Sequence, residues 1–461
     1  MVETLRKSLR DSAAARWTAL FIVSFTMMCG YFLSDVLSPL VGLLESQLAW
    51  TRADYGIYTS SYGWFNVFLL MLIFGGIILD KLGIRITGLG ATALMVIGTA
   101  IKYWAISTNT LDGTILFGLK AQLFWACIGF AVFAVGVEVS GITVSKIIVK
   151  WFKGKEMATA MGMQVALARV GTALALGFSV PIARATGIID VSRPVLVALV
   201  ALCIGLISFL VYVVMDKKLD ASEATDLVEE TDPEDEFKIS DIGKILTNKG
   251  WWYIAILCVL FYSAVFPFLK YATDLMVNKF GVDQNIAGLI PMLLPFGNIL
   301  LTPLFGGIYD RIGKGATIMI IGSVLLIIVH ALFSVPGLNS WIIAMILVVL
   351  LGVAFSLVPS AMWPSVPKIV PEKRLGTAYS LIFWVQNWGL MGVPLLIGWV
   401  LEKYCITGQT MRDGMLVNTY DYTLPMMIFT TFGVLALIFA FLLKAEDKKK
   451  GYGLESPNIQ H

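Results

Sequence analysis

Two charged residues of opposite sign stand inside long apolar stretches of this chain, Glu138 and Arg169. They flank a short basic turn, WFKGKE at residues 151–156. If both stretches are helices, each charge lies about 18–20 Å from the turn, because a helix rises about 1.5 Å per residue. A carboxylate and a planar two-donor guanidinium at the same depth suit a ligand that carries both an ammonium and a carboxylate. The alternative is a structural ion pair that joins the two helices, although buried pairs stabilise proteins poorly.

The composition indicates a membrane protein that crosses the bilayer many times. Of 461 residues, 58% are hydrophobic and 14% are charged, whereas soluble domains carry about 25% charged residues. The net charge of +3 excludes a nucleic-acid partner. The five cysteines fit no metal or disulfide spacing. No metal-hydrolase or nucleophile-elbow motif occurs, so we expect neither an enzyme nor a cofactor or metal site.

Twelve apolar segments reach the length of about 20 residues that a spanning helix needs. We therefore predict an all-α integral membrane protein with twelve transmembrane helices. The segments are 17–43, 55–79, 86–106, 116–147, 157–184, 194–215, 250–277, 284–308, 316–335, 341–365, 375–401 and 422–443.

An acidic stretch divides these segments into two sets of six. The predicted units are an N-terminal segment, a first bundle, a linker, a second bundle and a tail, at residues 1–16, 17–215, 216–249, 250–443 and 444–461. The two bundles echo each other in sequence, because GGIILDKLGIR after the second segment matches GGIYDRIGK after the eighth. Parallel repeats with a site at their interface are typical of transporters, so we predict two pseudo-symmetric six-helix bundles.

Lys and Arg concentrate in the loops on the side of the two termini. The positive-inside rule then places both termini in the cytoplasm. The absence of an N-x-S/T glycosylation sequon favours a bacterial inner membrane.

Further polar residues inside the segments are candidates for the same site. Asp35 is a candidate for substrate contact, proton transfer or the outer gate, and Tyr31 lies one turn below it. Lys270 is a candidate pocket residue that can also pair with Asp274 at i, i+4. Gln386, Asn387 and Trp384 complete the set: the two amides lie at a depth similar to Arg169 and suit a peptide bond, and Trp384 suits an aromatic wall.

Two other ionisable residues inside the apolar segments have simpler interpretations. Lys102 is near the end of its segment and is expected to extend its ammonium to the interface. His330 suits a proton relay by its ordinary pKa range, but a structural histidine is the simpler interpretation.

The loop Gly-x-x-x-Asp-Lys/Arg-x-Gly-x-Arg/Lys, present after segments two and eight, resembles the signature loop of the major facilitator superfamily. The resemblance implies the major facilitator fold and a conformational role for the loop residues. The gating candidates are Asp80, Arg85, Glu156, Asp310 and Arg311, with Glu156 joining the relay at the start of the fifth segment.

A narrower resemblance is to the branch of that superfamily that contains the lysosomal dipeptide transporters. It is carried by WFKGKE, by ALARVG at 166–171, by LGTAY at 375–379 and by QNWG at 386–389. It implies facilitated movement of dipeptides by uniport, with Glu138 and Arg169 holding the peptide termini. Animal members of the branch pair with a glycosylated accessory subunit, and nothing in this sequence indicates one or a lysosomal sorting motif.

The predicted protein is thus a monomeric transporter that moves dipeptides or similar small zwitterions through the lipid bilayer by alternating access. The location is lysosomal if the source is eukaryotic. A carrier of organic anions or amino acids that uses Arg169 alone, with or without proton coupling, remains an alternative. A sensor that binds without translocating is a third possibility, against which the two intact signature loops argue.

Overall fold

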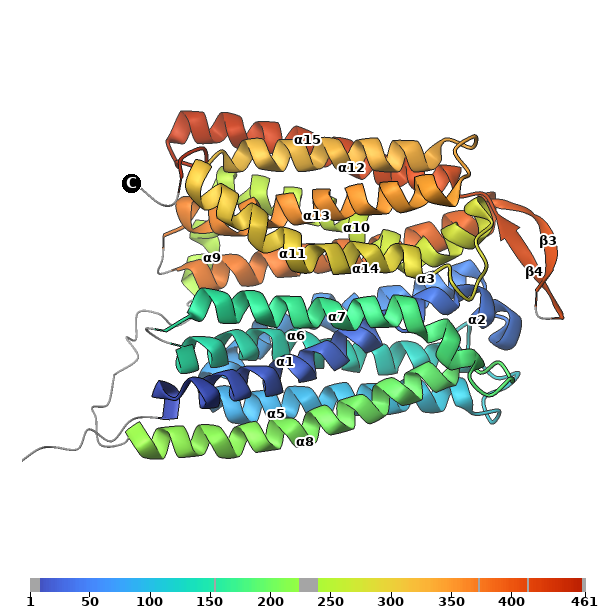
Figure 1. Cartoon of the computed structure of the whole chain (residues 1–461), viewed down its shortest axis with the longest axis horizontal. Coiled ribbons are helices and arrows are strands. Elements are labelled where there is room, and N and C mark those ends of the chain that lie inside the picture. The colour runs from blue at the N-terminus through green and yellow to red at the C-terminus, as the bar shows by residue number, and fades with distance from the viewer. Residues whose placement is uncertain (1–8, 153–154, 224–238, 372–373, 413, 458–461) are drawn as a thin grey trace, which may run out of the picture.

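The computed structural model describes residues 9–152, 155–223, 239–371, 374–412 and 414–457, and it consists mainly of long, roughly parallel helices (Figure 1). Eleven helical stretches of this part are long and apolar enough to cross a bilayer. The long helices are α1 (Ala13–Asp35), α5 (Met71–Ser107), α6 (Ala121–Phe152), α7 (Met157–Arg184), α8 (Ser192–Glu223), α10 (Lys249–Phe280), α11 (Leu289–Ile312), α12 (Gly315–Ser334), α13 (Trp341–Ile369), α14 (Leu375–Tyr404) and α15 (Thr423–Lys450). The predicted all-helical membrane architecture is confirmed.

The second crossing is built from short pieces rather than one helix. It runs through α3 (Arg52–Ser60), the 3-10 turn η3 (Ser61–Gly63), α4 (Trp64–Phe68) and the start of α5. Inside α5 the chain turns back at Gly83, whose φ of 74° and ψ of 174° are not helical. Glycine adopts this positive φ without steric cost. The rest of α5 is the third crossing, so the described residues account for the twelve predicted crossings, one of which is not a continuous helix.

Shorter elements lie at the ends of the bundle. α1 continues through η2 (Ser38–Leu40) into α2 (Val41–Leu48), and η1 (Leu9–Asp11) precedes it. Two antiparallel hairpins, β1 (Ile115–Leu116) with β2 (Leu119–Lys120) and β3 (Ile406–Arg412) with β4 (Met415–Tyr420), were not predicted. The hairpin β3–β4 projects from the end opposite the C-terminus (Figure 1). We call these two ends the hairpin end and the termini end.

The predicted linker is only partly within the described residues. α8 continues past its predicted end at 215 to Glu223, and residues 224–238 lie outside the described part. The described part of the linker contains a short helix, α9 (Ile239–Leu246).

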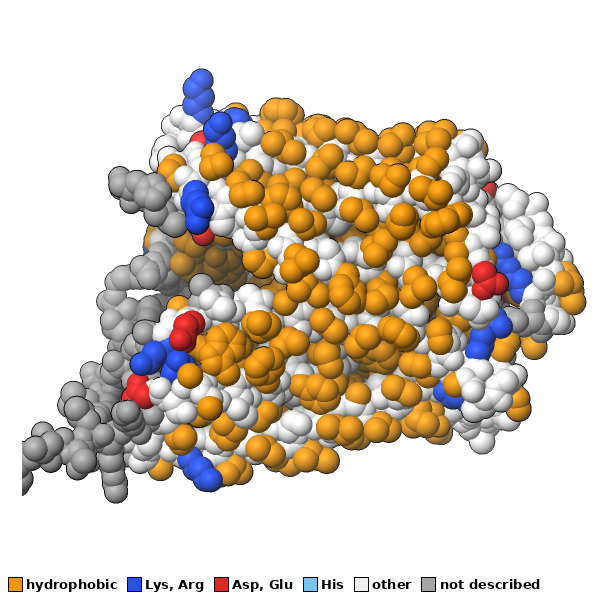
Figure 2. All heavy atoms as spheres, viewed as in Figure 1, with side chains coloured by type: hydrophobic (Ala, Val, Ile, Leu, Met, Phe, Trp, Pro, Cys, Tyr) orange, Lys and Arg blue, Asp and Glu red, His pale blue; other side chains and the backbone are white. Residues whose placement is uncertain are grey.

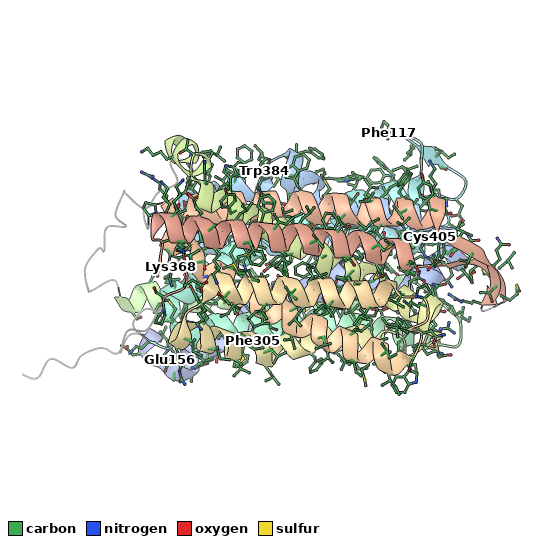
Figure 3. The ribbon with its side chains drawn as sticks, turned by 90° about the horizontal axis from the view of Figure 1, so that it is seen from above. Phe117, Glu156, Phe305, Lys368, Trp384 and Cys405 are labelled. Carbon is green, nitrogen blue, oxygen red and sulfur yellow. The ribbon has the colours of Figure 1, made fainter. Side chains whose placement is uncertain are left out.

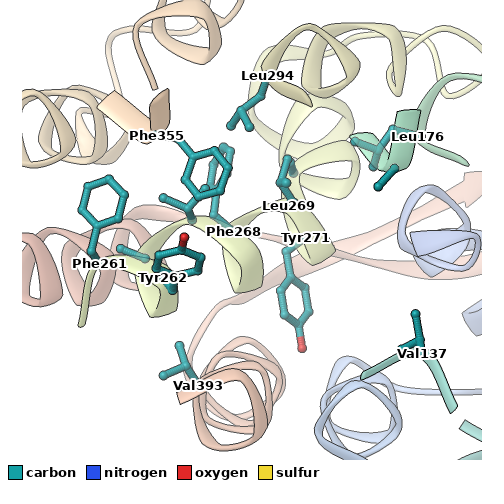
Figure 4. Packing of buried hydrophobic residues seen from close by; sticks show 14 of the residues in the cluster. Val137, Leu176, Phe261, Tyr262, Phe268, Leu269, Tyr271, Leu294, Phe355 and Val393 are labelled. Atoms are coloured by element: carbon teal, nitrogen blue, oxygen red, sulfur yellow. The ribbon is translucent and has the colours of Figure 1, made fainter. Parts of the chain in front are cut away.

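The helices form two layers, which we call the first half (α1 to α8) and the second half (α10 to α15) (Figure 1). The face of the molecule drawn in Figure 2 carries a broad apolar band, with the charged side chains gathered at the two ends. The interior of the second half is aromatic, with Phe261, Tyr262 and Phe268 of α10 near Phe355 of α13 (Figure 4). This distribution is the one expected when the surrounding solvent is lipid.

The halves meet through α3 and α14 at nearly backbone-to-backbone distance. A Cβ on Gly398 would lie 2.3 Å from the carbonyl oxygen of Arg52, and one on Gly56 would lie 2.9 Å from that of Pro394. Small residues allow such approach between membrane helices.

A buried ion cluster joins the halves at the hairpin end. Arg52 of α3 is fully buried and donates from Nε and Nη2 to the carboxylate of Asp274 in α10, at 3.0 and 2.9 Å. Its Nη1 donates to Glu45 of α2 at 2.7 Å, and its guanidinium lies 4.4 Å from the ring centroid of Tyr420 in β4. Tyr422 also donates to Asp274. This cluster holds the two halves together at the hairpin end.

We predict that Gly398→Val lowers the thermal midpoint of the purified protein and that Gly392→Ala does not. Both glycines lie in α14, but only Gly398 faces backbone atoms within contact distance, whereas a Cβ at Gly392 meets nothing within 4 Å. Overpacking of this kind costs about 1–3 kcal/mol. Fluorescence-monitored melting in detergent measures both variants, and an equal midpoint for the two would contradict the packing described.

We further predict that Arg52→Gln is more destabilising than the double variant Arg52→Gln with Asp274→Asn. The single change leaves the carboxylate of Asp274 buried without its cation, which costs about 3–5 kcal/mol. The double change removes that uncompensated charge, so part of the lost stability returns. Lys403→Gln, at an exposed lysine of the same end, is the control. A double variant less stable than the single one would refute this account of the cluster.

Candidate functional site

A cavity of about 540 Å³ lies between the two halves. Its walls come from α1, α6 and α7 in the first half and from α10, α11, α13 and α14 in the second. Figure 2 shows the surface hollowed between the halves at the termini end. A smaller cavity of about 120 Å³ extends the first toward the hairpin end and shares five residues with it, namely Tyr31, Glu138, Arg169, Phe266 and Gln386.

Glu138 of α6 lines both cavities, and one hydrogen bond is recorded for its side chain within the described residues. The hydroxyl of Tyr62, in the turn η3, donates to its Oε1 at 2.7 Å. Tyr62 lines the smaller cavity. Sequence analysis did not select Tyr62, because nothing local distinguishes it from the other tyrosines of the same segment.

Arg169 of α7 also lines both cavities, and its guanidinium lies among aromatic rings. Its Cζ is 5.5 Å from the ring centroid of Tyr31, 5.3 Å from that of Phe266 and 5.4 Å from that of Phe355. Cation–π attraction holds a guanidinium at such distances. Within the described residues, the structure records no hydrogen bond or ion pair for Arg169. The structural ion pair with Glu138, one of the two sequence-based alternatives, is therefore not formed in this conformation.

Asp35 and Lys270 form an ion pair of 2.6 Å across the two halves. Lys270 also donates to the carbonyl oxygen of Ser34 at 2.7 Å. The suggested pairing of Lys270 with Asp274 is wrong, because Asp274 faces Arg52 instead. Both Asp35 and Lys270 line the smaller cavity, on its side toward the hairpin end.

The amide residues of α14 take different positions. Gln386 lines both cavities and accepts a weak hydrogen bond from the thiol of Cys258 at 3.6 Å. Asn387 lines the larger cavity, but its Nδ2 donates to the carbonyl oxygen of Phe383 in its own helix at 3.0 Å. Trp384 lines neither cavity: its indole donates to the carbonyl oxygen of Val67 at 3.1 Å, and it lies at the edge of the bundle (Figure 3). The predicted aromatic wall at Trp384 is therefore wrong, because this face of α14 is turned away from the cavity.

The wall of the larger cavity includes polar groups that sequence analysis missed. Asn298 of α11 accepts from the hydroxyl of Ser356 at 2.8 Å, and its Nδ2 has no partner within the described part. Tyr262 accepts from the indole of Trp363 at 3.0 Å. Asn298 sits in an apolar stretch that contains three prolines, and a lone amide in such a stretch was the available signal.

The two other ionisable residues considered from sequence are buried. Lys102 is fully buried with no hydrogen-bond partner for its ammonium among the described residues, and it faces the rings of Tyr58 and Phe130 at 5.1 and 5.0 Å. The expected extension to the interface is therefore wrong. His330 is fully buried between Phe268 and Phe429, away from both cavities.

The charged residues of the first signature loop form ion pairs with helices of the first half. Asp80 pairs with Lys146 of α6, and Arg85 pairs with Asp216 of α8 at 2.6 Å and with Asp220. Lys150, Asp216 and Asp220, which complete this network, were not predicted as members.

Glu156 does not join that network as expected. It pairs with Arg16 at the start of α1, at 3.1 Å, at the termini end (Figure 3). A hydrogen bond from its own backbone amide, followed by one from Arg16, lowers the pKa of Glu156. In the second loop, Asp310 is half-buried and Arg311 is exposed at the end of α11.

The described residues contain no group of three or more His, Cys, Asp or Glu side chains that could hold a metal ion.

Comparison with known proteins shows the family to which this architecture belongs. The model of the Major Facilitator Superfamily matches residues 20–394 and 271–458. The lysosomal dipeptide transporter MFSD1 of Danio rerio is 28% identical over 401 residues, which are 84% of this chain and 81% of that protein. The sequence-based resemblance to this branch is thus confirmed.

Solved structures agree on the fold. A bacterial homologue of the human lysosomal transporter Spinster, in an inward-facing and occupied conformation, has a TM-score of 0.69 at 14% identity and covers 95% of this chain and 98% of its own. The inward-open xylose transporter from E. coli has a TM-score of 0.67 at 15% identity, over 92% of this chain and 95% of its own. At these identities the likeness concerns the fold alone. The chain belongs to the major facilitator superfamily and is a multi-pass membrane transporter rather than an enzyme.

Proposed function

We propose that this transporter moves dipeptides or similar small zwitterions by alternating access, as a uniporter. The observation that carries the proposal is that Glu138 and Arg169 line the same cavities without pairing with each other. A site lined by one half-buried acid and one half-buried base that do not pair with each other is complementary to a ligand that brings an ammonium and a carboxylate. Such a ligand satisfies both charges at once, whereas an anion or a cation alone leaves one of them unpaired.

The volume and lining of the larger cavity support a substrate of dipeptide size. Small-molecule sites commonly measure about 300–1,000 Å³ and combine apolar walls with a few polar groups, and the cavity of about 540 Å³ fits that range. Tyr31, Phe266 and Phe355 supply flat apolar walls beside Arg169. Gln386 can hydrogen-bond with a peptide bond. The relative named as a lysosomal dipeptide transporter supports the same class of substrate.

Alternating access is supported by the contrast between the two ends. The ion pair of Asp35 with Lys270 and the cluster around Arg52 join the halves at the hairpin end. The larger cavity opens at the termini end (Figure 2). With both termini in the cytoplasm, this is an inward-open state of a monomer, in which Asp35 and Lys270 act as an outer gate rather than as substrate ligands. The location that we propose is a bacterial inner membrane.

The signature loops act in the same cycle. Within the described residues, the ion pairs recorded for Asp80, Arg85 and Glu156 are with residues of the first half. We assign these residues, with Asp310 and Arg311 of the second loop, to the closing of the termini end in the outward-open state.

We predict that dipeptides raise the thermal midpoint of the wild type. Arg169→Gln and Glu138→Gln should each weaken the affinity for dipeptides by about tenfold or more, because a hydrogen bond to a charged group contributes about 1.5–3 kcal/mol. The ligands are a neutral dipeptide, its N-acetylated form, its C-terminal amide and an amino acid. A ligand that binds only the folded state stabilises it by RT ln(1 + L/Kd), where L is the free ligand concentration, so at a fixed concentration a tighter ligand raises the midpoint more.

The blocked ligands assign the two subsites. Loss of binding on N-acetylation alone implicates Glu138, and loss on amidation alone implicates Arg169. Lys403→Gln is the control, and uptake into liposomes follows with the same ligands. Binding of anions that lack an amine, with no preference for the free dipeptide, would replace the proposal with the organic-anion or amino-acid carrier. Binding without uptake would indicate a sensor.

A further inference from the structure

Tyr62 occupies an unusual place in the second crossing. It is the middle residue of η3, the 3-10 turn between α3 and α4. This turn packs tightly against the second half, because a Cβ on the neighbouring Gly63 would lie 2.6 Å from the Cβ of Met391 in α14 and 3.3 Å from the carbonyl oxygen of Asn387. The position of Tyr62 is therefore set by the contact between the halves.

The hydroxyl of Tyr62 donates a hydrogen bond to Glu138, and both side chains line the smaller cavity. Its separation of 2.7 Å from Oε1 is typical of a hydrogen bond to a charged oxygen. Glu138 has no other recorded hydrogen bond or ion pair in the described part of the chain. Its orientation in the cavity thus depends on this single donor.

Glu138 and Arg169 face the same two cavities. Opposite charges in a site of low dielectric attract each other strongly, and long side chains can swing together. The aromatic rings around Arg169 retain the guanidinium from one side. The carboxylate of Glu138 is held in turn by its hydrogen bond from the hydroxyl of Tyr62.

We propose that Tyr62 is a positioning residue that holds Glu138 away from Arg169, so that the empty carrier keeps separate ammonium and carboxylate subsites. This inference rests on the proposed function and deepens it. Without the hydroxyl, the carboxylate of Glu138 turns to Arg169, the two charges neutralise each other, and a ligand ammonium must displace the guanidinium to bind. Preorganised separation of this kind increases affinity without a new ligand contact.

The same geometry makes Tyr62 a selectivity residue for the free amine. Its effect acts through Glu138, so it concerns the ammonium of the ligand and not the apolar side chains. Removal of the hydroxyl should therefore reduce the discrimination between a free dipeptide and its N-acetylated form, which a general loss of stability would leave unchanged.

The test compares Tyr62→Phe with Tyr58→Phe. Tyr58 lies one turn earlier, in α3, its ring stacks on Phe130 at 4.8 Å, and its hydroxyl has no partner within the described residues. The ring of Tyr62 contacts the same Phe130 at 5.6 Å. Each variant thus removes one hydroxyl from neighbouring rings, but only one hydroxyl binds Glu138.

The measured quantity is the ratio of the Kd of N-acetylated leucyl-alanine to that of leucyl-alanine, by calorimetry in detergent. We expect this ratio to fall by about tenfold or more in Tyr62→Phe, and to stay at the wild-type value in Tyr58→Phe. A wild-type ratio retained in Tyr62→Phe would overturn the inference while leaving the proposed function intact. A wild type that does not distinguish the two ligands would instead overturn the proposed function.

A second measurement does not depend on recovery of the variant. An experimental structure of the substrate-free wild type should keep the hydroxyl of Tyr62 within 3.2 Å of Glu138 and the charges of Glu138 and Arg169 more than about 4 Å apart. A direct ion pair between Glu138 and Arg169 in that inward-open structure would refute the role assigned to Tyr62.

Discussion

The proposed site depends on two opposite charges, Glu138 and Arg169, that line the same two cavities without pairing with each other. At 4 Å and an effective dielectric constant of about 20, a carboxylate and a guanidinium attract each other by about 4 kcal/mol. Here Glu138 is held by a tyrosine hydroxyl and Arg169 by aromatic faces, so neither uses the other as its partner. Under the proposed function, both charges are available to a ligand, and the cavity walls can be apolar because the polar recognition is concentrated in a few groups.

The irregular second crossing makes this arrangement possible. Non-helical backbone at membrane depth is tolerated where it is buried in protein or lines a cavity. The turn η3 satisfies that condition, because it lies between the smaller cavity and α14. A continuous helix would place its side chains at fixed intervals of about 100°, whereas the 3-10 turn advances them by about 120°. The break thus gives Tyr62 its own orientation and lets Gly56 and Gly63 bring the first half close to the second.

The bonds that join the halves are distributed unequally between the two ends. At the hairpin end, Arg52 and Lys270 each bridge to a carboxylate on the other half, in buried surroundings where such pairs are costly to break singly. At the termini end, the recorded ion pairs of the first signature loop remain within the first half. The same molecule therefore presents one closed and one open end, which is the asymmetry that a carrier must be able to reverse.

Composition and hydrophobic length were enough to predict the lipid environment of this protein, its twelve apolar segments, and two charges within those segments. Hydrophobic length and charge position are local properties, so they can be counted along the chain. The partners of the charges were decided only by the tertiary structure. Lys270 has Asp274 one turn away, yet it binds Asp35, 235 positions distant in sequence. Glu156 binds Arg16 rather than the signature loop, and Trp384 faces the edge of the bundle. Each outcome depends on which helices become neighbours and on how each is rotated about its axis, and a helix that is apolar on all sides carries no periodic signal for that rotation.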